Sequence, residues 1–361
     1  MRAADDRFGR RDAWSSDTRS RVAVLFRDIV MKKLACGLLA ITPGLWAQEA
    51  AETVPLKYRS QRNWSITMPG ASWVKIGSAI ELASHSFAVR SEGTGLGVDT
   101  DGDGETNVVV QLAADKTGHV KLRNGDYRYA IELANRGGGW FFRTASIKQA
   151  NVEGTRLRLI DQNGNGRFGD VGQDAMIVGR GNVATFLSRA VNIGGRLWQL
   201  EVVDDDGAVR LTPFAGPVGT LDMTSKLESN GKLLSAIVSS NDGQYCFDLS
   251  RGAQTVPVGS YRIHSGAIGL GETTVGVRRG NAEDLVVQDG ATAQLEWGGP
   301  ARAEFAYRHQ GDKVEFRPDE VWYYGNSGEE YTEWQPVGKS PTFDVIRDGE
   351  VIAKAIFPGS C

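Results

Sequence analysis

The sequence predicts an all-β fold of antiparallel sheets, arranged as two β-sandwich or barrel-like domains, and three observations support this expectation. From about residue 55 onward, short segments alternate apolar with polar residues, which is the pattern of strands that bury one face. The chain holds 45 glycines among its 361 residues, a share typical of turn-rich proteins. Asn-Gly and Asp-Gly pairs, which favour the tight turns of β-hairpins, separate many of these segments, at 124–125, 206–207, 230–231, 242–243 and 348–349.

The first 47 residues are expected to be a leader that is absent from the mature protein. Met31 opens a basic segment, a short apolar run follows, and Ala47 ends the run at a small residue, which is the order of a secretory signal peptide. We interpret residues 1–30 as an extension ahead of the true start at Met31, the alternative being an unusually long basic segment. The protein is therefore expected to start near Gln48 and to be exported, to the periplasm or as a secreted protein. The apolar run is too short to be a stable membrane span.

The rest of the chain divides into two predicted domains, 48–217 and 218–361. The division rests on the segment 214–219, where glycine and proline interrupt the alternating pattern. A hydrophobic content of 41% provides enough apolar material for two cores. The net charge of -3 gives no electrostatic case for nucleic acid or for an anionic membrane, so neither is an expected partner.

Two Asp/Asn-rich loops in the first predicted domain have the spacing of calcium ligands. Calcium takes about six to eight oxygen ligands, and short side chains at positions 1, 3 and 5 of one loop supply several of them, together with the backbone carbonyl of position 7. Glycine at position 6 allows the sharp turn. The expected ligands are Asp161, Asn163, Asn165, Arg167, Asp170 and Asp174 in the second loop, and Asp99, Asp101, Asp103 and Glu105 in the first.

Both loops differ from an EF-hand in their last ligand and in their flanks. Position 12, where a glutamate is expected, is Val110 in the first loop and Gly172 in the second. Asp170 and Asp174 are the substitutes in the second loop, and the flanking segments alternate like strands. The loops therefore resemble the helix-less EF-hand-like loops of secreted bacterial proteins, relatives of the dockerin-type loop. This resemblance covers about a dozen residues per loop and implies no activity.

An ordinary turn is the alternative for each loop, because Asp, Asn and Gly tolerate the left-handed backbone of turns between strands. Three aspartates within five residues of the first loop repel one another unless a cation or solvent intervenes. The second loop has two asparagines in place of aspartates, which predicts a weak site with a Kd of about 10⁻⁴–10⁻³ M. Calcium is accordingly the expected cofactor.

In the second predicted domain, V-P-V-G-S-Y-R-I (256–263) resembles the P-x-G-x-Y strand entry of prealbumin-like or carboxypeptidase-regulatory-like sandwiches in exported bacterial proteins. Pro257 and Gly259 shape the entry, and Tyr261 begins an alternating segment. The resemblance implies a β-sandwich for this domain.

Two cysteines, Cys246 and Cys361, remain after the leader. An even pair in an exported chain is compatible with one disulfide bond. Two free thiols are the alternative, because the sequence does not give the distance between them.

No linear motif of an enzyme is found. The four histidines are widely separated without an H-E-x-x-H pair, and there is no G-x-S-x-G nucleophile elbow. We interpret 325–328 as a hairpin turn, and the separation of the Glu329 and Glu330 carboxylates is not given by the sequence.

An aromatic cluster at 322–334 is the candidate ligand-binding surface. Strand alternation places Trp322 and Tyr324 on one face and Tyr323 on the other. With Trp334, the first two can form an exposed platform that stacks on sugar rings, or they can pack inside the sandwich.

Three functional hypotheses therefore remain open. The leading one is an exported, non-catalytic calcium-binding β protein in which calcium stabilises the fold. The second is a binding module for carbohydrate or a cell-envelope polymer, using the aromatic cluster, with an extracellular polymer or an envelope protein as its partner. The third is an enzyme that lacks a recognisable linear motif.

Overall fold

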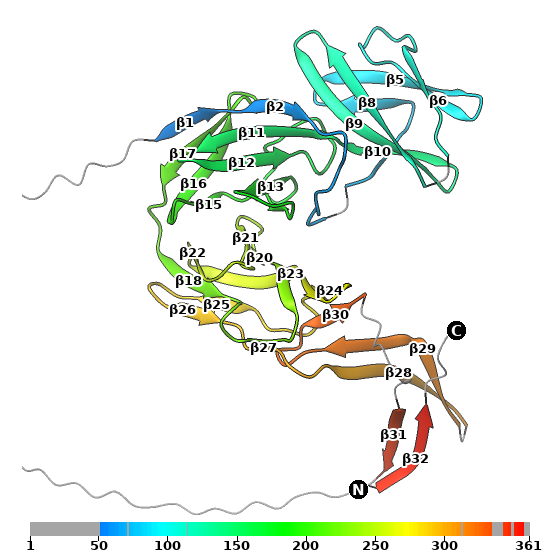
Figure 1. Ribbon diagram of the computed structural model, residues 1–361, viewed down its shortest axis with the longest axis vertical. Coiled ribbons are helices and arrows are strands. Elements are labelled where there is room, and N and C mark those ends of the chain that lie inside the picture. Colours follow the sequence, from blue (N-terminus) through cyan, green and yellow to red (C-terminus); the bar gives the residue numbers. More distant parts are fainter. Residues whose placement is uncertain are drawn as a thin grey trace, which may run out of the picture. The chain divides into compact units, whose positions relative to one another are not determined.

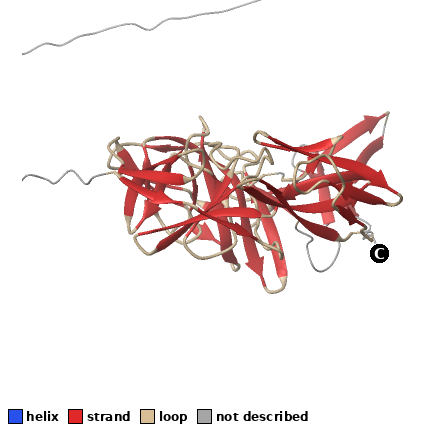
Figure 2. Cartoon of the chain, turned by 90° about the horizontal axis from the view of Figure 1, so that it is seen from above, coloured by secondary structure: helices blue, strands red, loops and turns tan. Residues whose placement is uncertain are grey.

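The computed structural model describes residues 51–70, 72–113, 115–311, 313–333, 342–347 and 350–356. Within these ranges the chain consists of strands, turns and loops without a helix, which confirms the predicted all-β class (Figure 2). Nothing in this part of the chain forms an apolar helix of membrane-spanning length. The predicted leader and its cleavage point lie outside the described residues, so the start site and export stay predictions.

Four antiparallel sheets are built from the strands between residues 52 and 213 (Figure 1). Their strand orders are β3-β10-β9-β8, β4-β5-β6-β7, β1-β17-β16-β15 and β14-β13-β12-β11-β2. The bounds of these strands are β1 Glu52–Pro55, β2 Lys57–Ser60, β3 Val74–Lys75, β4 Ala79–Leu82, β5 His85–Glu92, β6 Gly95–Val98, β7 Val108–Val110, β8 Thr117–Asn124, β9 Tyr127–Arg136, β10 Gly139–Thr144, β11 Ser146–Val152, β12 Thr155–Ile160, β13 Ala175–Val178, β14 Thr185–Phe186, β15 Ala190–Ile193, β16 Arg196–Val203 and β17 Ala208–Pro213.

The strands after residue 217 form a large sheet with the path β21-β20-β23-β24-β30-β29-β28, to which β25 adds by pairing with β23, and three smaller sheets, β22-β18-β26, β19-β27 and β31-β32. The pairs β18–β26 and β19–β27 are parallel, unlike the predicted antiparallel pattern, because long connections rather than hairpins join their strands. The bounds are β18 Val218–Asp222, β19 Leu227–Glu228, β20 Lys232–Ser240, β21 Cys246–Asp248, β22 Gln254–Pro257, β23 Gly259–Leu270, β24 Thr273–Arg278, β25 Leu285–Val287, β26 Thr292–Gln294, β27 Trp297–Gly298, β28 Arg302–Gln310, β29 Lys313–Tyr324, β30 Glu330–Thr332, β31 Thr342–Arg347 and β32 Glu350–Ile356.

Two main hydrophobic cores lie among the described residues. The first is built from strands of the 80–211 region and includes the fully buried Phe87, Tyr129 and Leu159. The second is built mainly from residues after 220 and includes Tyr261 and Trp297. Burial of each such side chain contributes about 1.5–3 kcal/mol to the free energy of unfolding. The predicted domain boundary at 217 stays a prediction.

The P-x-G-x-Y segment forms the end of β22 and the start of β23. The hydroxyl of the buried Tyr261 donates a hydrogen bond of 2.8 Å to the carbonyl of Pro257, which fixes the entry of β23. The resemblance of this segment to prealbumin-like sandwiches stays a prediction.

Candidate metal centre

The first acidic loop connects β6 to β7 and brings three carboxylates together. Asp99, Asp101 and Asp103 each offer an oxygen within 4.8 Å of the others, so this group can hold a metal ion. Asp99 is 2% exposed, whereas the other two side chains reach solvent. Glu105 is exposed, and its amide donates to Oδ1 of Asp103.

Backbone amides fix the buried carboxylate of this loop. Oδ1 of Asp99 accepts from the amides of Asp101 and Gly102, at 3.1 and 2.7 Å, and Oδ2 accepts from Gly104 at 2.9 Å. Burial raises the pKa of Asp99, but these hydrogen bonds outweigh burial and hold the pKa below its usual value. Asp99 is therefore ionised and held in place, with its neighbours open to a cation.

The second loop, between β12 and β13, repeats this plan around Asp161. Oδ1 of Asp161 accepts from the amides of Gly164 and Asn165, at 2.7 and 3.2 Å, and Oδ2 accepts from Gly166 at 2.6 Å. In both loops the carboxylate at position 1 thus bonds the amides of positions 4 and 6. Position 5 accepts from the amide of position 7 in both, at 2.8 Å in the first and 2.9 Å in the second.

A glycine at position 4 is a shared signal that the sequence analysis missed. Gly102 and Gly164 have φ of 78° and 71°, and Gly104 and Gly166 at position 6 have φ of 90° and 85°. Side chains other than glycine seldom adopt this left-handed backbone. The pattern D-x-[DN]-G-[DN]-G therefore specifies the geometry of both loops more closely than the EF-hand head alone.

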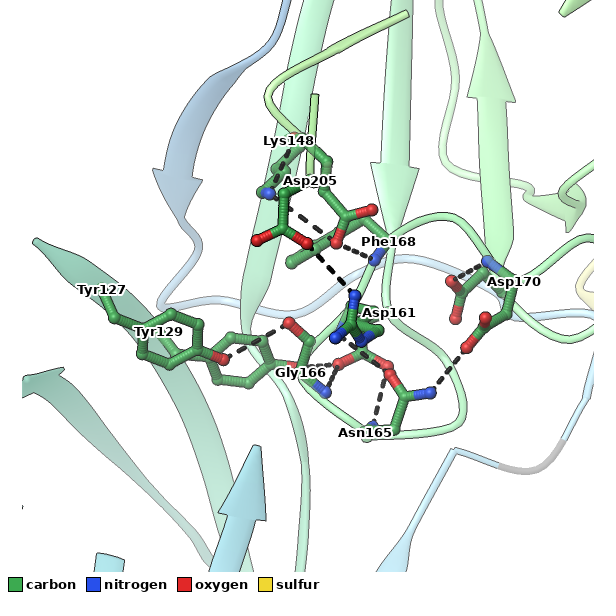
Figure 3. Close-up of polar contacts among 12 residues, drawn as sticks. Tyr127, Tyr129, Lys148, Asp161, Asn165, Gly166, Phe168, Asp170 and Asp205 are labelled. Atoms are coloured by element: carbon green, nitrogen blue, oxygen red, sulfur yellow. Dashed lines mark hydrogen bonds and ion pairs between the residues drawn. The ribbon is translucent and has the colours of Figure 1, made fainter. Parts of the chain in front are cut away.

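Asp161 is fully buried, and a tyrosine from another sheet reaches it. The hydroxyl of Tyr129 in β9 donates to Oδ2 of Asp161 at 2.5 Å, as Figure 3 shows. Burial raises the pKa of Asp161 to about 6, although hydrogen bonds from Tyr129 and three loop amides oppose the shift. The buried Tyr129 hydroxyl has a pKa well above its ordinary value because of burial and the neighbouring Asp161 charge.

Three further predicted ligands of the second loop converge on one point. The side-chain amides of Asn163 and Asn165 both donate to Oδ2 of Asp170, at 3.0 and 2.6 Å, and Figure 3 shows the bond from Asn165. Asp161 lies at the base of the same loop and has no ion pair with a described lysine or arginine. The loop thus brings together the half-buried carboxylate of Asp170, the side-chain amides of Asn163 and Asn165, and the buried carboxylate of Asp161.

Asp174 is fully buried and closes the loop from below. Its Oδ1 accepts from the amide of Gln162 at 3.2 Å, and its Oδ2 accepts from the amide of Asp170 at 2.9 Å. Burial and the charge of Asp161 raise the pKa of Asp174 to about 8. The charge of Asp161 therefore disfavours ionisation of Asp174, and neither carboxyl group forms an ion pair with a described lysine or arginine.

Residues far apart in sequence hold the second loop. The carbonyl of Asn165 accepts from the amide of Ala83 at 2.6 Å, and the hydroxyl of Tyr127 lies 3.4 Å from the carbonyl of Gly166. Arg167, predicted to use its carbonyl, pairs its guanidinium with Asp205 at 3.2 Å. The loop therefore contacts the β4–β5 turn, β9 and the β16–β17 turn.

The β16–β17 turn is a second feature that the sequence analysis did not assign to the site. Asp204, Asp205 and Asp206 all have positive φ, between 51° and 63°, a backbone conformation that costs free energy for residues other than glycine. Oδ2 of Asp206 accepts from the amide of Phe168 at 2.9 Å, and its carbonyl accepts from Nζ of Lys148 at 2.7 Å. The turn is thereby docked on the loop.

Replacing Asp206 by Ala is expected to lower the free energy of unfolding by about 1–2 kcal/mol, because the half-buried amide of Phe168 loses its acceptor. Urea unfolding measures the change. Asp204→Ala, at the same turn, is the control, since no described side-chain hydrogen bond reaches Asp204. Equal destabilisation by both variants would contradict the docking role of Asp206.

The other predicted sites are not brought to these loops. Trp322 is 36% exposed in β29, Tyr324 is half-buried in the same strand, and Trp334 lies outside the described residues. The aromatic platform therefore stays a prediction.

Cys246 is buried and free among the described residues, and burial raises its thiol pKa to about 12. Cys361 lies outside them, so the disulfide also stays a prediction.

Glu329 and Glu330 do not form an open pair of acids. Glu329 is fully buried, and its carboxylate accepts hydrogen bonds from Gly298, Ser327 and Tyr331. Glu330 binds Arg278 through both oxygens, at 2.5 and 2.8 Å. Residues 325–328 form the turn that joins β29 to β30, as predicted.

No protein-family model, curated protein or solved structure matches this chain. The geometry of the loops is therefore the basis for a functional proposal.

Proposed function

We propose that this is an exported, non-catalytic calcium-binding β protein in which calcium, held by the loops at 99–105 and 161–174, stabilises the fold. The observation that carries the proposal is the repeated loop geometry, in which a buried position-1 aspartate is fixed by the amides of positions 4 and 6 while oxygen-bearing side chains gather at positions 3 and 5.

The chemistry of the donors fits calcium. The three carboxylates of the first loop are hard oxygen ligands within 4.8 Å of one another. In the second loop, the side-chain amides of Asn163 and Asn165 donate hydrogen bonds to Asp170. Rotation of these side-chain amides, with loss of the hydrogen bonds that their oxygens accept from the backbone amides of Asn165 and Arg167, would turn the oxygens toward Asp170, where the three side chains would hold a cation.

The two buried carboxyl groups support the same proposal. Asp161 and Asp174 are both fully buried and have no described ion pair. A divalent cation at the mouth of the loop would favour their ionised forms, which burial disfavours. Because strands from several sheets contact the second loop, an ion there would hold those segments together.

Calorimetric titration of the metal-stripped protein with calcium tests the proposal. We expect binding with a Kd of about 10⁻⁴–10⁻³ M, a loss of binding to the first loop in Asp101→Ala/Asp103→Ala, and a loss to the second in Asn163→Ala/Asp170→Ala. Asp242→Ala, which removes an aspartate from an ordinary hairpin turn, is the matched control and should bind like the unaltered protein. Absence of calcium binding at millimolar concentration would refute the proposal.

A further inference from the structure

The sheet β3-β10-β9-β8 has one apolar face and one basic face. Val120, Leu122, Ile131, Leu133 and Phe142 are buried in the first core. Successive residues of a strand point to opposite sides, and residues paired across strands share a side. The side opposite the core therefore carries Lys75 from β3, Arg143 from β10, Arg128, Glu132 and Arg136 from β9, and His119, Lys121 and Arg123 from β8.

This face, called the basic face below, differs sharply in charge from the whole chain. It carries the six cations Lys75, Lys121, Arg123, Arg128, Arg136 and Arg143 against the single carboxylate of Glu132, whereas the chain has 41 basic and 44 acidic residues. Burial lowers the pKa of His119, and the nearby charges of Arg62 and Lys121 lower it further. Arg62 and Lys121 thus lie close enough to His119 to disfavour its charged form.

Glu132 neutralises only one of these cations. Its Oε2 accepts from Nε and Nη2 of Arg143, at 2.6 and 2.5 Å, and its Oε1 accepts from the hydroxyl of Thr117 at 3.0 Å. Glu132 is 6% exposed, and its same-side neighbours Ala130 and Ala134 are 0% and 3% exposed, so the centre of the face is covered. Among the described residues, no carboxylate pairs with Lys75, Lys121 or Arg136, and all three are exposed.

Indole rings hold two of the guanidinium groups in fixed positions. The guanidinium carbons of Arg136 and Arg143 lie 4.3 and 4.7 Å from the ring centre of Trp73, and that of Arg143 lies 5.6 Å from the ring of Trp64. A stacked guanidinium keeps its charge and its edge N–H donors, and it loses less side-chain freedom on binding an anion.

We propose that the basic face binds a linear acidic polysaccharide through its carboxylate or sulfate groups. Five of its cations are exposed and lie around a centre where Ala130, Glu132 and Ala134 are buried, so the face offers separated cations to a polymer with repeated anionic groups. The guanidinium fork matches the two oxygens of a carboxylate or sulfate. This inference does not depend on calcium binding.

Two other polyanionic partners fit the face less well. Single-stranded nucleic acid binds by stacking its bases on open aromatic rings, whereas guanidinium groups stack on Trp73. Protein surfaces that bind membranes insert large apolar side chains into the lipid. The large exposed apolar residues of the described chain lie on other strands, for example Leu234, Leu270 and Val286.

The test is binding of the full chain to immobilised polygalacturonate and dextran sulfate, with neutral dextran, single-stranded DNA and anionic phospholipid vesicles as comparison probes. Chelator is present, so that calcium cannot cross-link the polyuronate. We expect binding to an acidic polysaccharide that weakens as salt is raised, and no binding to dextran. Comparison of binding to polygalacturonate and to dextran sulfate shows whether the face prefers carboxylate or sulfate groups.

The variant Lys75→Gln/Lys121→Gln/Arg136→Gln should bind at least about tenfold more weakly, because three unpaired cations are removed. The control Lys232→Gln/Arg262→Gln/Arg302→Gln removes three exposed cations elsewhere and should bind normally. Thermal melting of both variants checks their fold. Binding unaltered in the first variant, equally weakened in the control, or stronger to DNA or vesicles than to either acidic polysaccharide would overturn the proposal.

Discussion

Calcium should raise the melting temperature of this protein by about 5 °C when its concentration is about a hundredfold above the Kd. A ligand that binds only the folded state adds RT ln(1 + [L]/Kd), or about 2.7 kcal/mol at that excess, and each kcal/mol shifts the melting temperature of a large domain by about 2 °C. Differential scanning calorimetry in millimolar calcium and in excess chelator measures the shift.

Asp161→Ala should remove most of the rise in melting temperature that calcium binding to the second loop provides. It should also destabilise the metal-free protein. The carboxylate accepts from three loop amides and from the Tyr129 hydroxyl, and the substitution leaves these donors without it. We expect a loss of about 3 kcal/mol in chelator, because each buried unsatisfied donor costs about 1–3 kcal/mol and neighbouring losses are not additive.

The control for this experiment is Asp242→Ala, which removes the acceptor for Ser240 and Gln244 at a hairpin turn. It should lower the melting temperature slightly and leave the calcium increment intact. If calcium and chelator give the same melting temperature for the unaltered protein, calcium does not stabilise the fold.

Glu329→Ala should lower the free energy of unfolding by about 3–5 kcal/mol, since it removes the acceptor of several buried donors. Oε1 accepts from the amide of Gly298 at 2.7 Å and from the hydroxyl of Tyr331 at 3.0 Å. Oε2 accepts from the hydroxyl and the amide of Ser327, at 2.6 and 3.1 Å. One carboxylate therefore joins β27, the 325–328 turn and β30.

Urea unfolding of Glu329→Ala and of Glu329→Gln measures this effect. The Gln variant keeps one oxygen and the shape of the side chain, so it should lose less stability than the Ala variant. Glu272→Ala, at an exposed turn, should change the free energy of unfolding by less than about 0.5 kcal/mol. A loss below about 1 kcal/mol in Glu329→Ala would show that the buried carboxylate does not hold this junction.

Local patterns were sufficient to predict the strand-rich fold and the positions of the two loops. An alternation of apolar and polar residues indicates a strand with one buried face. Asn-Gly or Asp-Gly pairs indicate a backbone conformation that few other residues adopt. The loop heads are likewise largely local, because the carboxylates of Asp99 and Asp161 accept from the amides of Gly104 and Gly166, five residues away. A prediction that depends on neighbours in sequence succeeds where the interactions are themselves between neighbours.

Tertiary structure alone decided what surrounds these loops. Nothing near Asp161 in sequence indicates that Tyr129, 32 residues away, donates to its carboxylate, or that Asp206 docks on Phe168 across 38 residues. The basic face has the same origin, because Lys75, Lys121, Arg136 and Arg143 are dispersed in sequence and share a side only through strand register. The sequence by itself determined the strands, the turns and the loop heads, whose energetics are local. Which strands became neighbours, and hence where charge gathered or was buried, depended on long-range packing of the cores, which no short pattern encodes.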